Sequence, residues 1–474
     1  MRRILLLIAA GACLALLSQI ALKWNTLQGV IFYSMGDNEH AIERFQTAIQ
    51  EDADNLYAQF YLGQAYFQRG NFSQAVEHLR TVTLLVPSHH KAYYLLGISL
   101  AAQKQYDTAI VAIQRAIELQ PSIPQYYYQL GLLYKDKMEY KMAIDAFQTA
   151  ITNGMKDDDL YFNLGYVYNQ SGKPDKALQQ FQMALSKNPE HYYANLEMAR
   201  ILLKEDKLEE AVREYRIATK IMPDDFLSRF ELSMALQNMG QLTSAYQELE
   251  RAAHLNPNHP ELDKRYFSLG MAFKEQGKID TAIPIMLRAI DIAPGKAEYY
   301  YQVGLLYKDI ESYQKALSAL SRAAFLGLNS EDLYFNLGYV YRQTGNLQKA
   351  LLEFHKILEI NPRHPYVHAE LARIYVEQDK IDDAIREFEI DVAISPNRFF
   401  SHYDLGLLYK KKNRLTLARK HLEKAVMLDP HYPYTCKYLW EIYELLDLAE
   451  NQLPHSIKSI CALKKQNPLP ISKQ

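Results

Sequence analysis

The chain has 474 residues, more than one hydrophobic core usually supports, so several domains or a repeat array are expected. Hydrophobic residues make up 49% and charged residues 23%, a composition typical of folded rather than disordered protein. The 53 basic and 55 acidic side chains give a net charge of −2, which argues against nucleic acid as the main partner.

An apolar segment begins the chain. After two arginines, residues 4–22 contain only two polar side chains. Because a helix needs ~20 apolar residues to cross a bilayer, we predict a single-pass membrane anchor in residues 1–23. The flanking charges favour a cytoplasmic N-terminus and repeats on the extracytoplasmic side. Two alternatives remain: a cleaved signal peptide, which would give a secreted or periplasmic protein, and a buried helix that caps the array.

Small residues then recur at intervals of 34. The period is carried by Gly29, Gly63, Gly97, Gly131 and Gly165, and by Ala41, Ala75, Ala109, Ala143 and Ala177. After Pro257 the frame shifts by three residues and resumes with Gly270, Gly304, Gly338 and Gly406. Such a fixed period indicates a stacked array of similar units.

Residues 158–191 show how one unit is built. Apolar residues at helical spacing predict a first helix, a Gly-Lys-Pro turn ends it, and a second helix follows until Pro189. Gly165 and Ala177 are small where the two helices cross closely, and Phe181 fills the space beside them. Because such a hairpin cannot bury its own apolar face, it must stack on its neighbours.

This unit resembles the tetratricopeptide repeat (TPR), whose signature is read here in Leu164, Gly165, Tyr168, Gly172, Ala177, Phe181, Ala184 and Pro189. The resemblance extends over about residues 22–432, in about twelve repeats. It implies an all-α, right-handed solenoid, with repeats 1–7 in residues 22–259 and repeats 8–12 in residues 263–432.

Part of the array is duplicated. Residues 126–136 read YYYQLGLLYKD and residues 299–309 read YYYQVGLLYKD, while residues 160–168 and 333–341 are both LYFNLGYVY. The offset is 173 residues throughout, equal to five repeats plus three residues. The array is therefore a doubled block with a seam near residues 258–262.

The chain ends in a cap and a tail. Residues 433–450 predict one amphipathic helix without a partner, which suits the terminal cap that an array needs. Residues 451–474 are polar and contain prolines, so a mostly disordered tail is expected, chiefly after about Ala462. The three cysteines exclude a disulfide framework, although a Cys436–Cys461 bond remains possible in an oxidising compartment.

The TPR resemblance implies that the first helices line a concave groove that often binds an extended peptide. Polar or aromatic residues near the glycine position of these helices are the candidate contacts: Gln129, Asn163, Tyr166, Arg200, Gln302, Asn336, Tyr339 and Arg373. Amides can pair with a peptide backbone, and arginine can hold a carboxylate. Alternatively, the duplication alone preserves these residues, and the two tyrosines pack against the next repeat.

Signatures of catalysis are absent, so we expect no enzyme, no cofactor and no small-molecule substrate. His364 and His368 lack a third ligand, and no metal is expected. The sequence favours a membrane-tethered TPR scaffold that binds protein or peptide segments and contacts the membrane through residues 4–22. The alternatives are a structural or self-assembling component of a larger envelope complex, or a regulatory arm for a separate enzyme.

Overall fold

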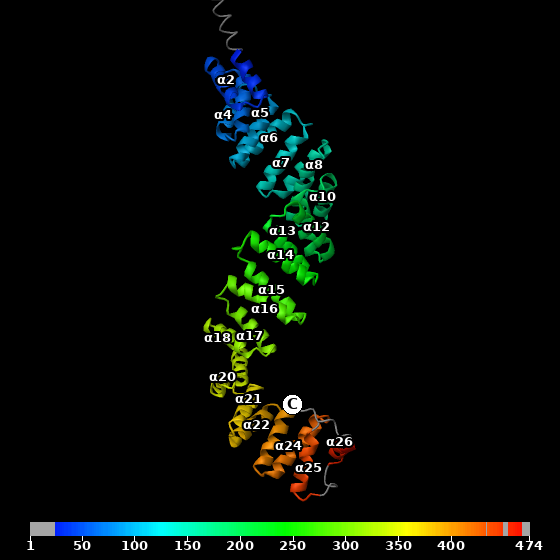
Figure 1. The fold of residues 1–474 in the computed structure, drawn as a ribbon. Coiled ribbons are helices and arrows are strands. Elements are labelled where there is room, and N and C mark those ends of the chain that lie inside the picture. Colours follow the sequence, from blue (N-terminus) through cyan, green and yellow to red (C-terminus); the bar gives the residue numbers. More distant parts are fainter. Residues whose placement is uncertain (1–23, 433, 449–453, 467–474) are drawn as a thin grey trace, which may run out of the picture. The chain divides into compact units, whose positions relative to one another are not determined.

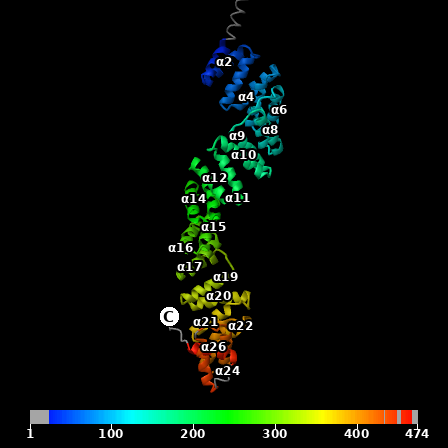
Figure 2. The same ribbon diagram turned by 90° about the vertical axis from the view of Figure 1, so that its right-hand side faces the viewer.

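Helices follow one another along the chain, in pairs joined by tight turns (Figures 1 and 2). The computed structural model describes residues 24–432, 434–448 and 454–466, and no strand occurs among them. Two compact units form, residues 1–256 and 257–474, and the division falls beside the seam inferred from the duplication. The predicted all-α array of helix pairs is confirmed.

The first unit begins with helical residues 24–34, which approach α2 closely: a Cβ added to Gly29 would lie 2.5 Å from the Phe45 ring. Its further helices are paired in chain order, α3 with α4 through α13 with α14. Their bounds are α2 Asn38–Glu51, α3 Leu56–Gln68, α4 Phe72–Leu85, α5 His90–Ala102, α6 Tyr106–Leu119, α7 Pro124–Asp136, α8 Tyr140–Thr152, α9 Asp158–Gln170, α10 Pro174–Lys187, α11 Tyr192–Lys204, α12 Leu208–Ile221, α13 Phe226–Asn238 and α14 Leu242–Leu255.

The second unit repeats this order, pairing α15 with α16 through α23 with α24. Two further helices follow α24. The bounds are α15 Leu262–Glu275, α16 Ile279–Ile292, α17 Ala297–Asp309, α18 Tyr313–Phe325, α19 Glu331–Gln343, α20 Leu347–Ile360, α21 Val367–Glu377, α22 Ile381–Ile394, α23 Phe399–Lys411, α24 Leu415–Leu428, α25 Thr435–Leu445 and α26 His455–Gln466.

Close crossing of the two helices holds each hairpin together. A Cβ atom added to Gly165 of α9 would lie 2.7 Å from the Phe181 ring and 3.2 Å from the Ala177 carbonyl oxygen of α10. Phe181, Ala177 and Ala184 are fully buried. The predicted roles of the glycine, alanine and phenylalanine positions are therefore confirmed: the missing side chain on one helix admits the ring of the other.

The turn between the paired helices also recurs. Gly172 follows α9 with a φ of +75°, a left-handed conformation that glycine adopts without strain. The same conformation recurs every 34 residues, at Met138 before it and at Asp206 after it, where no glycine is present. The turn is therefore imposed by the hairpin as a whole, and glycine at this position is favoured but dispensable.

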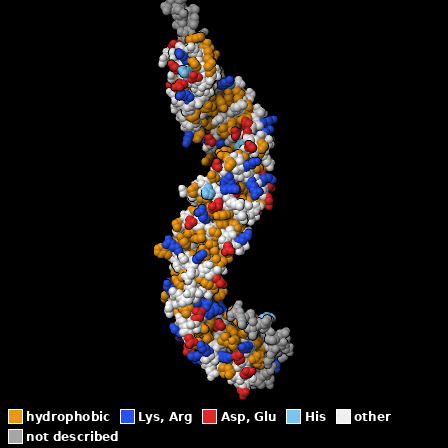
Figure 3. Space-filling view, in the orientation of Figure 1, with side chains coloured by type: hydrophobic (Ala, Val, Ile, Leu, Met, Phe, Trp, Pro, Cys, Tyr) orange, Lys and Arg blue, Asp and Glu red, His pale blue; other side chains and the backbone are white. Residues whose placement is uncertain are grey.

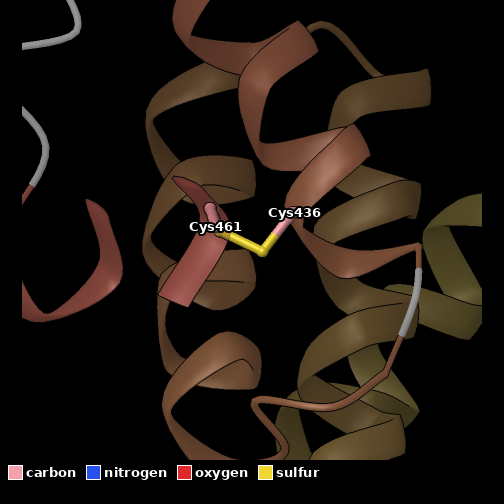
Figure 4. Close-up of a disulfide and its surroundings, with 2 residues drawn as sticks. All are labelled: Cys436 and Cys461. Atoms are coloured by element: carbon pink, nitrogen blue, oxygen red, sulfur yellow. A yellow bond between two sulfur atoms is a disulfide. The ribbon is translucent and has the colours of Figure 1, made fainter. Parts of the chain in front are cut away.

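The C-terminal end differs from the sequence-based expectation. Residues 451–474 are predicted to be mostly disordered, but α26 occupies part of this range. Ile457 and Cys461 of α26 are buried in the core that α24 and α25 share. A disulfide joins Cys436 of α25 to Cys461 of α26, with 5.5 Å between their Cα atoms (Figure 4). The cap is therefore two cross-linked helices, because buried apolar residues and a covalent bond order a segment whose composition is mainly polar.

The predicted single-pass membrane location, with its membrane contact through residues 4–22, is corrected by the structure. No helix in the described part of the chain is long and apolar enough to cross a bilayer. Helices α2 to α26 have 11 to 14 residues, whereas a spanning helix needs ~20. Residues 1–23, on which the anchor and signal predictions rest, lie outside the described residues.

Candidate functional site

A cavity of about 320 Å³ opens beside the first helices α17 and α19 of two neighbouring hairpins. The turn after α17 and the start of α18 complete its wall. It is lined by Lys308, Asp309, Glu311, Tyr313, Phe335, Asn336 and Tyr339. Two of the predicted groove residues, Asn336 and Tyr339, therefore share one cavity, and they share it with a lysine.

The lysine and the asparagine are bonded to each other. The ammonium of Lys308 donates to Asn336 Oδ1 at 2.8 Å, and Asn336 Nδ2 donates to the Asp332 carbonyl oxygen at 2.7 Å. Asn336 also forms a hydrogen bond with Tyr301, whose pKa is raised mainly by burial and secondarily by Asp332. The amide thus joins two adjacent first helices and holds the ammonium of a residue that lines the cavity. We call this cluster the Lys308 site.

The first unit contains the same arrangement, which we call the Lys135 site. Lys135 donates to Asn163 Oδ1 at 2.7 Å, and Asn163 Nδ2 lies 3.2 Å from the Tyr128 hydroxyl and 2.8 Å from the Asp159 carbonyl oxygen. Shifted by 173 residues, six of the seven positions that line the Lys308 cavity carry the same residue, and only Met138 differs, replacing Glu311. The duplication has therefore preserved a complete cluster in each unit.

The electrostatics of the Lys135 site favour an acceptor from outside. Burial lowers the pKa of Lys135, the charge of Asp136 opposes this shift, and the amide bonded to the ammonium is neutral. Burial, followed by Asp159, raises the pKa of Tyr128 to about 12, so this hydroxyl stays protonated at neutral pH. A partly buried cation bonded to a neutral amide can still take a carboxylate or a carbonyl oxygen.

In two other repeats a glutamate stands at the asparagine position and pairs with an arginine of the preceding first helix. Arg200 Nη2 lies 2.9 Å from Glu231, and Arg342 Nε lies 3.3 Å from Glu370 of the next repeat. In these pairs a carboxylate neutralises the cation, so little capacity is left for an anionic ligand. At the Lys135 and Lys308 sites an asparagine takes the place of the glutamate, and the ion pair of the Lys308 ammonium, with Asp309, is longer at 3.9 Å.

The remaining predicted groove residues are distributed among several repeats. Gln302 accepts a hydrogen bond from Lys274 at 3.1 Å, Arg200 is held by Glu231, and Arg373 pairs with Glu370. Tyr166 is half-buried, with its ring centroid 6.5 Å from that of Phe162, and Tyr339 lines the Lys308 cavity. Gln129 is half-buried on α7. Their contact with a ligand stays a prediction.

Sequence reasoning missed the lysines. Lys135, Lys274 and Lys308 each stand four residues after the first-helix glycine, and each bonds to a residue 28 positions later. The sequence contains a signal for them: Lys135 and Lys308 lie in the YKD sequence that ends each copy of the duplicated segment. The two partners of each bond belong to different repeats, so a single repeat does not reveal the bond.

The histidines weighed as a metal site have different partners. His368 Nδ1 lies 2.7 Å from Glu387, whereas His364 Nε2 lies 3.9 Å from Glu331. Across the part of the chain that the structure describes, no group of three or more side chains is placed to hold a metal ion. One repeat later, His402 Nδ1 lies 2.9 Å from His421 Nδ1, so a second histidine stands where the preceding repeat has a carboxylate.

Acid is expected to weaken the hairpin of α23 and α24. Burial, followed by the charge of His402, lowers the pKa of His421 from 6.5 to about 4, and Glu389 opposes this shift. Because the folded pKa lies below the unfolded one, the stabilisation is complete above the unfolded pKa and is lost as the pH falls from about 6.5 toward 4. The expected loss is about 1–2 kcal/mol, since partial exposure screens the effect.

Hydrogen exchange in α23 and α24 across this pH range measures that loss. The matched control is His421→Glu, which rebuilds the histidine–carboxylate pair that His368 and Glu387 form one repeat earlier. The variant should keep its protection in acid better than the wild type. Equal acid sensitivity of the two proteins would contradict the role given to the histidine pair.

Comparison with known proteins supports the repeat assignment. The family model described as Cilia and flagella-associated protein 70 C-terminal domain matches residues 7–231. Models described as tetratricopeptide repeat match residues 264–296, 301–365, 341–398 and 401–432. No curated protein matches the chain.

Several solved structures are similar to parts of the chain. A crystal structure of MamA is 30% identical, with a TM-score of 0.33, over 34% of this chain and 95% of that one. YrrB, described as a TPR protein with an unusual peptide-binding site, is 24% identical, with a TM-score of 0.36, over 40% of this chain and 96% of that one. PilF of Pseudomonas aeruginosa is 23% identical, with a TM-score of 0.40, over 44% and 95%. With family models of the repeat on the chain and helix pairs throughout its described part, the protein belongs to the tetratricopeptide repeat family.

Proposed function

We propose that the chain is a non-enzymatic scaffold that binds extended peptide segments of partner proteins at the Lys135 and Lys308 sites. The observation that carries this proposal is the preserved lysine–asparagine pair in each unit, with 2.7 and 2.8 Å between the bonded atoms. Each pair presents an ammonium whose nearest bonded partner is a neutral amide, beside a half-buried tyrosine.

The chemistry of each site suits an acidic side chain or a backbone carbonyl of a peptide. The ammonium has three donors, and Asn163 or Asn336 occupies only one of them. Tyr166 and Tyr339 offer rigid aromatic surface with a polar tip, which suits contact with an extended chain. Partial burial of Lys135 strengthens any charge-assisted hydrogen bond that it makes there, because less water competes.

Neutralising either lysine should reduce peptide binding. Lys135→Met and Lys308→Met each remove an ammonium while keeping a side chain of similar length. A charge-assisted hydrogen bond contributes about 1.5–3 kcal/mol, so the affinity of one site should fall about tenfold or more. The measurement uses the full chain against an array of short synthetic peptides rich in aspartate and glutamate, and then fluorescence anisotropy with the peptides that bind.

Lys274→Met is the matched control. Lys274 stands at the same position of its repeat and bonds to Gln302 at 3.1 Å, but it does not belong to the two duplicated sites. The control should bind the selected peptides like the wild type. Equal losses in all three variants would point to a purely structural role of these inter-repeat bonds and would overturn the proposed sites.

A further inference from the structure

A second, larger cavity lies on a different part of the second unit. It has a volume of about 670 Å³ and opens between the second helices α16 and α18, with α17 beneath them. Hydrophobic side chains lie next to basic ones over this segment of the surface (Figure 3). We call it the Phe325 pocket, after an aromatic residue that lines it and is 77% exposed.

The Phe325 pocket lacks a hydrogen bond that other repeats have. In those repeats, a tyrosine stands three residues after the glycine position of the first helix. Its hydroxyl forms a hydrogen bond with the side chain twenty positions earlier, on the second helix of the preceding repeat. This bond is 3.2 Å long for Gln114 and Tyr134, and 2.9 Å for Gln148 and Tyr168. For Tyr307 the residue in that place is Leu287, which cannot form it. The Tyr307 hydroxyl thus has no hydrogen-bond partner among the described residues.

Two cations line the pocket without carboxylate partners in the described part of the chain. The Arg322 guanidinium lies 4.9 Å from the centre of the Phe325 ring and 6.0 Å from that of Tyr300. The ammonium of Lys315 lies 5.5 Å from the centre of the Tyr307 ring. No aspartate or glutamate lines the cavity. The pocket is therefore rich in donors and positive charge, poor in acceptors, and walled by aromatic rings.

The duplication shows that these features are not a by-product of the repeat. The first block has Gln114, Met142, Thr149 and Thr152 at the positions of Leu287, Lys315, Arg322 and Phe325. The first helix between them is nearly unchanged, with YYYQLGLLYKD against YYYQVGLLYKD. The second block alone therefore has the two cations, the exposed phenylalanine, and the leucine that leaves Tyr307 without its hydrogen bond.

We infer that the Phe325 pocket binds a peptide segment of a partner protein that presents a carboxylate beside a large apolar side chain. The carboxylate is held by Arg322, Lys315 and the Tyr307 hydroxyl, because two of these donors are positively charged and no carboxylate of the pocket competes for them. The apolar side chain packs against Phe325 and Leu287. The volume falls within the range of sites that bury small ligands and peptide side chains, roughly 300–1,000 Å³. This surface shares no lining residue with the Lys308 cavity.

Fluorescence anisotropy with the full chain and labelled peptides tests the inference. The probe is a Gly/Ser peptide that carries one Asp-Phe pair, and the control peptides carry Asn-Phe or Asp-Gly instead. Arg322→Thr and Phe325→Thr introduce the residues that the first block has, so both are compatible with the repeat fold. Each should weaken binding of the Asp-Phe peptide at least tenfold, and Leu287→Gln should weaken it by supplying Tyr307 with an internal partner.

Arg288→Thr is the charge-matched control, because Arg288 is exposed on α16 but does not line the pocket. This variant should bind the Asp-Phe peptide like the wild type, and both control peptides should bind the wild type at least tenfold more weakly. The inference is overturned if the wild type does not bind the Asp-Phe peptide, if it binds the Asn-Phe peptide equally well, or if Arg322→Thr and Phe325→Thr leave the affinity unchanged. The groove proposal is unaffected by these outcomes, since Lys135 and Lys308 are intact in every variant.

Discussion

Replacing Phe181 with alanine is expected to destabilise the hairpin of α9 and α10 by about 3–5 kcal/mol. The ring is fully buried and occupies the space left open by Gly165, where an added Cβ would lie 2.7 Å from it. The substitution would leave a cavity at the closest approach of the two helices. Because each repeat contacts mainly its neighbours, the effect should be largest in this hairpin and in the two beside it.

Hydrogen exchange resolved along the chain measures this loss, since repeat arrays open locally rather than as one unit. Met183→Ala on the same helix is the control, because Met183 is 42% exposed and its truncation creates no buried cavity. Faster exchange in α9 and α10 is expected for Phe181→Ala only. Similar exchange in the two variants would refute the packing that we assign to the glycine and phenylalanine positions.

Removing the disulfide is expected to release the C-terminal cap. The bond closes a loop with a sequence separation of 25 residues, for which chain-entropy arguments give about 3–4 kcal/mol. Both sulfur-bearing residues are buried, so Cys436→Ser removes the bond without relying on access of a reductant. Helix α26 should then lose its protection from hydrogen exchange, while α24 should lose little, because its core is shared with α23.

Cys13→Ser is the control for this experiment, since it removes the one cysteine that takes no part in the bond. It should leave α26 protected. If Cys436→Ser also leaves α26 protected, apolar packing by residues such as Ile457 and Ile460 holds the helix, and the disulfide does not order it.

The repeat could be predicted from the sequence because its physical causes are local and periodic. Small residues recur at the positions of Gly165 and Ala177, and larger apolar residues recur at the position of Phe181. Their spacing predicts which positions must be small and which side chain fills the space between the helices. The same reasoning located the duplication. Neither prediction needs contacts between distant parts of the chain, and the structure confirms the close packing at Gly165, Ala177 and Phe181.

Features that cross repeat boundaries were not predicted. The bond between Lys135 and Asn163 spans 28 positions, and nothing in either hairpin alone requires it. In the Phe325 pocket, Leu287 leaves the Tyr307 hydroxyl without a partner, and this is recognised only by comparison with the bond between Gln114 and Tyr134. Helix α26 was missed because its composition is mainly polar and its order depends on a cysteine in another helix.

Calorimetric titration of the full chain with one selected groove peptide tests the central claim most directly. With one site in each unit, wild type should bind two peptides per chain. Lys135→Met and Lys308→Met should each bind one, and the double variant should bind none with comparable affinity, while Lys274→Met should still bind two. A single peptide per wild-type chain, or undiminished binding by the double variant, would contradict the account of two equivalent groove sites.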